Sequence, residues 1–344
     1  MYREAEYRER CRTRGLNAEA TDAAVAAVEA LESDVIDRDG RPVSISGTEV
    51  ERHIASLTAR GEAGPSTIVA LARYFVVAGL DAIAIRLLAY LSPIGVLPAM
   101  AERLCMLEGE AVRNRVMAGV AVPAPGSPPE AYPPSTEAFV RALEDELGEA
   151  RARLVLRWNV HGVPAEAFAE EREHYIAAAS IDDWLVGFHQ RQVAVLARHA
   201  SDGTLWYEQK ITPRVVDYVR NRPEVLGGAR DGDRILVTKI PYDPERYLLT
   251  DDPVEKRRLA CHCPLAASSI SATDAGVPAI WCACSAGYEK FLFDVVFGEE
   301  TEAEVLESVL AGDGRCRFSI KIPASVAARI PGTKTGGAEP GALL

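Results

Sequence analysis

Cysteine is the residue type whose placement in this chain most directly suggests chemistry. Five of the seven cysteines lie between residues 261 and 316, as Cys261-His262-Cys263, Cys282-Ala283-Cys284 and Cys316. The first ten residues alternate charges where a signal peptide would need an apolar run, so we expect a cytoplasmic protein. Disulfides are rare in that compartment. The cluster therefore predicts a metal site or thiolate chemistry.

A metal site is the first interpretation of this cluster. Thiolates bind soft and borderline metal ions, and a structural zinc site takes four ligands drawn from Cys and His. We expect zinc, with iron as the alternative ion. Two thiols one residue apart reach one ion only in a bent or extended loop, and the usual knuckle is C-x-x-C. The predicted ligands are Cys261, Cys263, Cys282, Cys284 and Cys316.

Catalysis by a thiolate is a second interpretation, and Cys284 is the best placed thiol for it. Cys284 directly precedes a helical pattern whose predicted apolar face runs through Tyr288, Phe291, Leu292 and Val295. A cysteine at a helix N-terminus has a lowered pKa and becomes nucleophilic near neutral pH. In an extended segment His262 would point away from its flanking thiols, where it could act as a base or orient a ligand.

Three further side chains are candidates for supporting roles. His189 lies at the edge of the apolar stripe of a predicted helix, where it could move a proton or simply form a boundary hydrogen bond. We expect Trp184 and Phe188 on the same helix to be core residues. We expect Glu307 and Tyr288 to contact and orient the thiols without binding the metal themselves. For Glu307, a carboxylate that faces solvent is the more common arrangement.

Inert packing is the remaining interpretation of the thiols. Free cysteine is among the most buried residue types, and Cys316 fits the apolar face of a strand. Cys11 and Cys105, each alone in a helical context, are assigned to packing or to the surface. His161 lies at a possible junction of a strand and a loop, and we assign it to a surface loop.

The elements that must position the cysteines belong to a mixed segment. Helical patterns cover residues 136–153, 164–179 and 181–199, with Ser180 as an N-cap, and Thr212-Pro213 begins a fourth helix. After these helices, apolar residues recur at every second position, which is the spacing of a β-strand. Residues 235–240 and 315–322 are predicted strands, and residues 304–310 are the expected partner of the second through a Gly-rich turn.

The N-terminal part has a different composition and reads as helical throughout. Residues 16–118 are rich in Ala and Leu, and helix starts are expected at the capping box Thr48-Glu49-Val50-Glu51 and at Pro65-Ser66-Thr67. Residues 122–135 contain six prolines and form the predicted linker. We therefore expect an α+β protein with a helical domain at 1–121, an α+β domain at 136–330 and an unpacked tail at 331–344.

Length, charge and hydropathy exclude some classes of partner. A chain of 344 residues with 48% hydrophobic residues has room for two cores. Its net charge of -12 disfavours binding to nucleic acid. The most apolar stretch, residues 68–100, is interrupted by charges and prolines, so no membrane span is expected. The expected partner is a small molecule, and the sequence is compatible with a homo-oligomer.

The last third of the chain resembles two known families. Gly312-Asp313-Gly314-Arg315-Cys316-Arg317-Phe318 resembles the G-D-x-x-C-x-F ending of the L-2-amino-thiazoline-4-carboxylate hydrolase family, and Cys263-Pro264 is similar to that family's C-P position. The same stretch, with Glu307 ahead of it, is similar to the 4-vinyl-reductase-type ligand-binding domain, an α+β module. The resemblance implies a pocket lined by cysteines and ring-opening hydrolysis of a thiazoline or a related cyclic compound.

Two functions from different classes follow from these patterns. The first is a small-molecule hydrolase that acts on a cyclic C-N or C-S substrate beside a zinc site, with Cys284, His262 and His189 as the catalytic candidates. The second is a sensor without enzymatic activity, which binds a metal or small molecule and passes the change on through its helical domain. P-loop, G-x-S-x-G and H-E-x-x-H motifs do not occur in the sequence.

Overall fold

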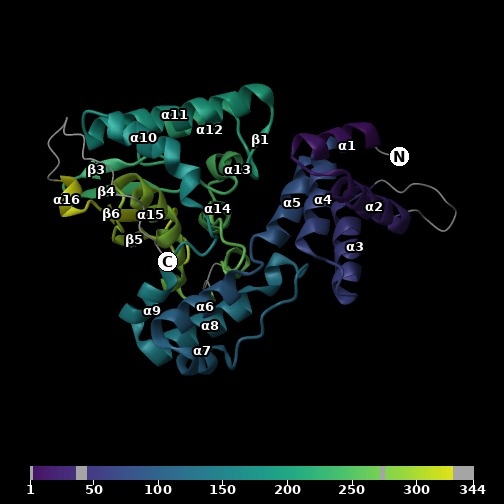
Figure 1. The fold of residues 1–344 in the computed structure, drawn as a ribbon, viewed down its shortest axis with the longest axis horizontal. Helices are drawn as coiled ribbons and strands as arrows, with labels where there is room; N and C mark the ends of the chain where they lie inside the picture. Colours follow the sequence, from purple (N-terminus) through teal and green to yellow (C-terminus); the bar gives the residue numbers. More distant parts are fainter. Residues whose placement is uncertain (1–2, 36–44, 272–275, 328–344) are drawn as a thin grey trace.

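The fold is α+β, as the sequence predicts: helices make up the N-terminal part, and a small antiparallel sheet lies in the C-terminal part (Figure 1). The computed structural model describes residues 3–35, 45–271 and 276–327. The predicted tail at 331–344 lies outside the described residues. Figure 1 shows the N-terminal helices as one lobe, with the helices above the sheet and the helices below it forming the rest.

The first lobe packs five helices around one apolar core. Tyr7 ties the first helix to the fourth, because its hydroxyl donates to the Ala70 carbonyl at 2.8 Å. Leu71 and Phe75, both fully buried, lie in the same core. The helices are α1 (Glu4–Thr13), α2 (Ala18–Val35), α3 (Gly47–Ala59), α4 (Pro65–Val77) and α5 (Asp81–Leu91).

Local capping signals fix where two of these helices begin. The capping box expected at Thr48 is wrong by two residues: Ser46 is the N-cap of α3, and its backbone N–H donates to Glu49 Oε2 at 2.7 Å. The reciprocal bond runs from the Glu49 N–H to Ser46 Oγ at 3.4 Å. Pro65 occupies the first position of α4, as predicted, where proline loses no helical hydrogen bond.

The boundary between the two main cores falls between α5 and the next helix. The first core ends at Tyr90, and the second begins at Val96. By packing, α6 (Val96–Glu108) and α7 (Glu110–Met117) therefore join the elements that follow them. The domain limits predicted at 121 and 136 stay a prediction, since packing alone does not define units that fold separately.

The proline-rich stretch returns to the first lobe instead of hanging free. Glu130 accepts two hydrogen bonds from the Arg86 guanidinium, at 2.8 and 2.9 Å. Gly126 has a φ of +85°, and a Cβ there would lie 2.3 Å from the Ala63 Cβ. Only glycine fits this position, so residues 122–132 act as a strap across the first lobe.

Helices supply most of the remaining residues. The predicted helix at 136–153 is two helices in the structure, because Gly148 interrupts it with a φ of +74°. Ser180 and Thr212 cap α11 and α12 through their side chains, as expected. The elements are α8 (Pro133–Leu147), α9 (Glu149–Leu156), α10 (Ala169–Ala177), α11 (Ile181–Asp202), α12 (Pro213–Arg220), α13 (Pro244–Leu249), α14 (Pro253–Ala260), α15 (Ala283–Phe297) and α16 (Ala324–Ala327). Short 3-10 turns occupy Pro129–Ala131, Ala165–Phe168, Ala267–Ser269 and Ala279–Cys282.

A four-stranded antiparallel sheet forms the centre of the C-terminal part. Its strand order is β3-β4-β6-β5, and a two-stranded hairpin of β1 and β2 stands apart from it. The pairing of the last two strands, with Val305 opposite Phe318, confirms the predicted hairpin. Phe318 and Ile320 are fully buried, as the alternation of residues 315–322 predicts. The strands are β1 (Leu205–Trp206), β2 (Gln209–Lys210), β3 (Ala229–Asp231), β4 (Arg234–Thr238), β5 (Ala303–Glu307) and β6 (Arg317–Lys321).

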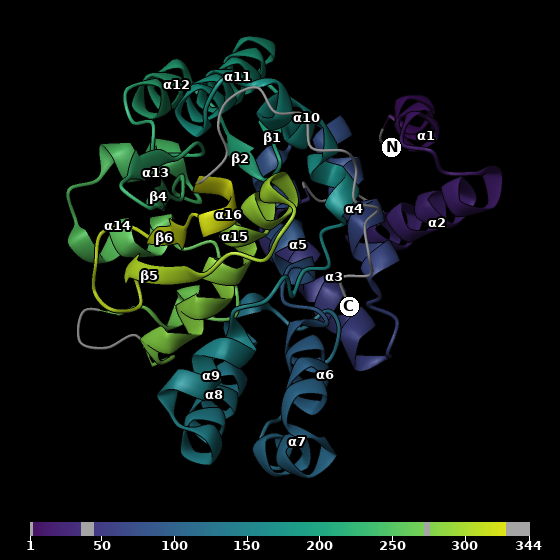
Figure 2. The same cartoon turned by 60° about the vertical axis from the view of Figure 1, so that its left-hand side comes forward.

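Helix α15 lies beside this sheet (Figure 2) and contains Cys284, with Cys282 as its N-cap. Its buried face passes through Cys284, Gly287, Phe293 and Phe297, whereas Tyr288 is 42% exposed. The apolar face predicted through Tyr288 is therefore wrong. Packing against other backbone decides the orientation: a Cβ at Gly287 would lie 2.2 Å from the backbone nitrogen of Trp158.

One stretch of the described residues, Asp81–Glu108, is long and apolar enough to cross a membrane by length and composition, with a mean hydropathy of 1.7. The stretch comprises α5 and α6, which a turn at residues 92–95 separates. Arg86 within it pairs with Glu51 at 2.7 Å and with Glu130 at 2.8 Å. A core helix of a soluble protein passes the same test, so this stretch is weak support for a membrane span.

Candidate functional site

Three separate segments bring the five clustered cysteines into one part of the second core. Cys261 ends α14, and Cys263 follows it in the next turn. Cys282 is the N-cap of α15, with Cys284 in its first turn. Cys316 directly precedes β6, and its carbonyl accepts from the Lys239 N–H at 3.0 Å, which ties it to the end of β4. The sheet and α15 together thus assemble the cluster.

The five cysteines share the second core: Cys261, Cys282, Cys284 and Cys316 are buried in it, and Cys263 packs against it. After burial, the causes that raise the pKa of Cys261 are the thiols of Cys263, Cys316 and Cys282. Cys284 in turn is affected by Cys263. We call these five residues the cysteine cluster.

Burial keeps these thiols protonated at neutral pH. It raises the pKa of Cys284 to about 12, and it also raises the pKa of Cys263, Cys282 and Cys316. The lowered pKa expected for Cys284 at the start of a helix is therefore wrong, because desolvation of a thiol that is only 8% exposed outweighs the helix dipole.

Several hydrogen-bond donors point at the sulfur atoms. The Trp281 indole donates to Cys263 Sγ at 3.2 Å, and the backbone N–H groups of Leu265 and Ala266 donate to the same sulfur. Ser308 Oγ donates to Cys282 Sγ at 2.9 Å. Each of these donors partly offsets the effect of burial, since hydrogen bonds to a sulfur favour its charged form.

The cluster is not a preformed coordination site. Within residues 3–35, 45–271 and 276–327, no group of three or more His, Cys, Asp or Glu side chains is arranged to hold a metal ion. The assignment of Cys261, Cys263, Cys282, Cys284 and Cys316 as ligands stays a prediction. Coordination would require the thiols to turn toward one another, since zinc–sulfur bonds are about 2.3 Å long.

A lysine at the end of β4 is the functional candidate that the sequence did not reveal. Lys239 Nζ lies 3.5 Å from Glu289 Oε1, and the two side chains are only 15% and 18% exposed. Burial disfavours the ammonium, but the Glu289 carboxylate, helped by nearby thiols once these ionise, outweighs it and raises the pKa of Lys239. The lysine interacts electrostatically with Cys263, Cys284 and Cys316. Its one signal in the sequence is a charged residue at the end of a buried strand.

Tyr288 and His161 connect the lysine with a cavity. Lys239 Nζ lies 5.2 Å from the centroid of the Tyr288 ring, and the His161 ring meets that ring edge-on at 5.8 Å. His161 lines a cavity of about 420 Å³. The prediction of a strand before His161 is wrong, because helix α9 ends at Leu156 and a turn follows.

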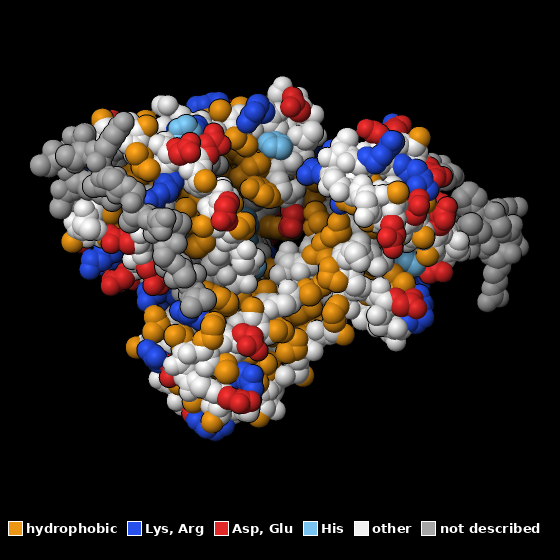
Figure 3. Space-filling model, viewed as in Figure 1, with side chains coloured by type: hydrophobic (Ala, Val, Ile, Leu, Met, Phe, Trp, Pro, Cys, Tyr) orange, Lys and Arg blue, Asp and Glu red, His pale blue; other side chains and the backbone are white. Residues whose placement is uncertain are grey.

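The cavity lies where the first lobe meets the rest of the molecule. Its walls come from the end of α5, the turn between α5 and α6, the loop at Val160 and His161, and Glu208 in the β1–β2 turn. Figure 3 shows the molecule hollowed at the centre of this face, with hydrophobic side chains around the hollow and an acidic side chain inside it. The cavity is therefore reachable from solvent.

His262 lies beside the cluster but has a fixed hydrogen bond. Its Nε2 lies 2.6 Å from the Ile240 carbonyl oxygen, and its ring contacts that of Tyr242 at 5.5 Å. Burial, with the charge of Lys239, lowers the pKa of His262 to about 3. The ring is neutral at physiological pH and is a weak base. Its assignment as a catalytic residue stays a prediction.

His189 is placed away from the cysteine cluster. It lines a second cavity, of about 540 Å³, between α11 and the segment that leads into β3, and its Nε2 lies 3.0 Å from the Val219 carbonyl oxygen. The structure gives it no contact with the thiols among the described residues. Trp184 and Phe188 stack at 5.6 Å in the core, as the sequence predicts.

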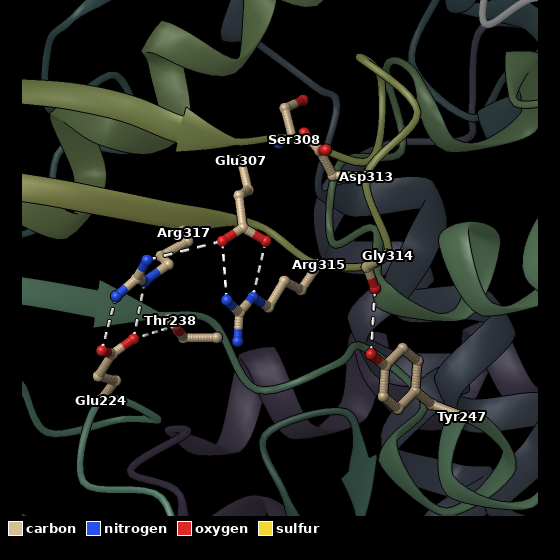
Figure 4. A network of polar contacts seen from close by, with 9 residues as sticks. All are labelled: Glu224, Thr238, Tyr247, Glu307, Ser308, Asp313, Gly314, Arg315 and Arg317. Atoms are coloured by element: carbon tan, nitrogen blue, oxygen red, sulfur yellow. Dashed lines mark hydrogen bonds and ion pairs between the residues drawn. The ribbon is translucent and has the colours of Figure 1, made fainter.

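Glu307 is part of an ion-pair network (Figure 4). Arg315 donates to both of its oxygens, at 2.7 and 2.8 Å, and Arg317 Nη1 lies 3.7 Å from Oε1. Arg317 also forms two hydrogen bonds of 2.8 Å with Glu224. Arginines thus hold this carboxylate in place. Among the described residues we find no contact between Glu307 and a thiol of the cluster, so its predicted supporting role stays a prediction.

Comparison with known protein families gives a match in the C-terminal segment. Residues 249–327 match the model of a "Family of unknown function (DUF6144)". The match contains all five cysteines of the cluster, α15, β5 and β6, but covers less than half of the chain. Neither the curated proteins nor the solved structures gave a match. The resemblance to hydrolase and vinyl-reductase families stays a prediction.

Proposed function

We propose that the cysteine cluster and the cavity of about 420 Å³ form one site, at which the chain hydrolyses a small cyclic C-N or C-S compound with the help of a zinc ion. The observation that supports this proposal is the position of Lys239. It interacts with three thiols on one side, and on the other it contacts Tyr288, whose ring meets His161 at the wall of the cavity.

The state of the thiols supports the metal component. Thiols crowded in a buried region repel one another as thiolates, so they stay protonated unless a cation replaces the protons. The donors from Trp281, Ser308 and the backbone after Cys263 would stabilise thiolates once a metal is bound. Zinc is proposed over iron on the chemistry of the donor set alone.

The raised pKa of the thiols also affects which group would attack the substrate. A thiol with a pKa of about 12 supplies little thiolate at neutral pH, so the proposal favours water over Cys284 as the attacking group. Zinc would act as a Lewis acid, and three protein ligands would leave one position open for water or substrate. Lys239, which stays protonated, would stabilise negative charge that develops on the substrate.

Metal analysis of protein purified without chelator tests the proposal. We expect about one zinc per chain, lost in Cys263→Ser and Cys282→Ser and retained in the control Cys105→Ser. Thiol titration should show additional reactive thiols after the metal is removed. A metal-free protein with the wild-type thiol reactivity in all variants would contradict the zinc component. Release of a ring-opened thiol or amine from a panel of thiazolines would test the hydrolysis.

A sensor without catalytic activity is the second candidate function. It is favoured by one observation: residues at the end of α5 and in the following turn, beside the first lobe, share the cavity with residues of the second core. A ligand there would contact both lobes and could alter how they sit together. Ligand binding without turnover on the same panel would favour this function. The cytoplasmic location and a small-molecule partner are proposed for either function.

A further inference from the structure

Glu208 is the one carboxylate among the residues that line the cavity of about 420 Å³, and the rest of the lining is mostly apolar. It lies in the turn of the β1–β2 hairpin, after Tyr207 with its positive φ of 52°. Its Oε2 accepts a hydrogen bond from the Tyr242 hydroxyl at 2.9 Å. Among the described residues, no Lys or Arg side chain forms an ion pair with it, so its charge is uncompensated.

The other ionisable group of the cavity adds no positive charge. Burial and the ammonium of Lys239 lower the pKa of His161, which leaves its imidazole neutral near pH 7. Burial raises the pKa of Glu208, and the bond from Tyr242 partly opposes this shift. A partly buried carboxylate without a counter-ion gains most from a partner that carries a positive charge.

We infer that this cavity binds a small organic cation, such as a protonated amine, with its charged head at Glu208 and its apolar body against Leu88, Leu91 and Val96. This inference deepens the proposed function, since it names the charge class of the substrate for the same pocket. The cation would replace water at the carboxylate, while the apolar walls would bury the remainder of the ligand. Tyr242 positions the carboxylate through its hydroxyl.

Three probes with one phenyl ring and similar size test the inference: benzylamine, which is cationic, benzyl alcohol, which is neutral, and benzoate, which is anionic. Their dissociation constants are measured by ligand-observed NMR on the full chain. We expect benzylamine to bind at least about tenfold more tightly than benzyl alcohol, with benzoate weakest, because a desolvated ion pair contributes on that order. Glu208→Gln keeps the shape and should reduce the preference for the cation to less than about threefold.

Two further variants place the binding in the cavity and keep the test decisive. Leu91→Trp should block all three probes, and the control Glu166→Gln, at an exposed position in another part of the molecule, should change none of them. Equal binding of the three probes, no binding of benzylamine at millimolar concentration, or an unchanged preference in Glu208→Gln would overturn the inference. Zinc content and thiazoline turnover are measured separately, so the cation preference can fail while the zinc proposal holds, or the reverse.

Discussion

Burial affects the thiols and the histidine of the candidate site in opposite directions, yet leaves both uncharged. The thiol of Cys284, with a pKa of about 12, keeps its proton at neutral pH, and His262, with a pKa of about 3, does not take one up. Lys239 and Glu289 form a half-buried ion pair beside these uncharged groups.

Alkylation kinetics can check the state of Cys284 in metal-free protein. At pH 7 its thiolate fraction is about five orders of magnitude below full ionisation, whereas an ordinary thiol with a pKa near 8.5 is ionised to about 3%. We expect iodoacetamide to label Cys284 at least about a hundredfold more slowly than the more accessible Cys105. The rate at Cys284 should rise about tenfold per pH unit between pH 7 and pH 9.

Site-resolved mass spectrometry would measure both rates in one sample, with Cys284→Ser to confirm the peptide assignment. Fast labelling of Cys284 at pH 7, with a plateau below pH 8, would show that the helix dipole dominates after all. The prediction applies to the native state, so the far-UV circular dichroism must stay unchanged over the pH range used.

Residue types and spacing predicted part of the site, and long-range contacts explain what they missed. The gathering of cysteines in one segment was visible in the sequence, and the structure brings Cys263, Cys284 and Cys316 to one region. Lys239, Glu289 and Glu208 carry no motif. They become relevant through long-range contacts that no local pattern encodes. Lys239 pairs with Glu289 and contacts Tyr288 on α15, and Glu208 in the β1–β2 turn lines the cavity together with His161.

At the scale of elements, the ion-pair network of Glu224, Arg315, Arg317 and Glu307 joins segments that are far apart in sequence (Figure 4). Glu224 precedes β3, Arg317 begins β6, and Glu307 ends β5 at an irregularity in the pairing. The Glu224 carboxylate is also within 3.2 Å of the Thr238 hydroxyl on β4. The network therefore holds together one end of three neighbouring strands.

Acid should weaken this network. The hydrogen bonds from Arg317 lower the pKa of Glu224, and those from Arg315 lower the pKa of Glu307. Because the folded values lie below the unfolded value near 4.5, their stabilisation is present above that pH. It is lost as the pH falls through the folded pKa values. Both carboxylates are partly solvated, so we expect Glu224→Gln to cost only about 1 kcal/mol at pH 7.

Urea unfolding at pH 7 and at pH 3 measures the effect. Glu224→Gln should lower the midpoint at pH 7 and lower it less at pH 3, because the wild-type carboxylate takes up protons as the pH falls below the unfolded value. Glu166→Gln, on an exposed 3-10 turn, serves as the control and should match the wild type at both values. An equal loss at both values would mean that Glu224 contributes through packing instead of charge.

Element types were predictable from the sequence to the extent that local chemistry sets them. Side-chain caps at Ser180 and Thr212 and the strand pattern around Phe318 act within a few residues, and the structure confirms both caps and the strand, although Ser319 is buried along with its apolar neighbours. The break at Gly148 and the orientation of α15 were missed. Gly148 was readable as a weak helix residue, but the face of α15 depends on the backbone of Trp158, more than a hundred residues earlier.

At the scale of the whole molecule, the two cores meet through few elements. The turn between α5 and α6 is the covalent link, and the strap of residues 122–132 adds contacts with the first lobe, among them the ion pair of Arg86 with Glu130. The sequence pointed to the strap as a linker because of its prolines. It could not show that α6 and α7 pack with the later elements, since their apolar periodicity suits either core.

Separate cores predict separable unfolding, and the distribution of tryptophan gives a direct probe. The first core ends at Tyr90, and all four tryptophans come later in the sequence, at positions 158, 184, 206 and 281. Their fluorescence therefore reports on the later part of the chain. Leu71→Ala removes a fully buried side chain from the first core and should cost about 2–5 kcal/mol there. We expect it to shift an early phase of the circular dichroism transition in urea while leaving the fluorescence transition in place.

The matched variant Phe139→Ala should do the opposite. Phe139 is fully buried in the second core and meets Trp281 edge-on at 6.4 Å, so its truncation should shift the fluorescence transition by a similar free energy. If both variants shift both probes equally, the cores unfold as one cooperative unit. The strap and the Arg86–Glu130 pair would then couple them tightly, and a ligand in the cavity between them would stabilise the whole chain instead of joining two separately stable lobes.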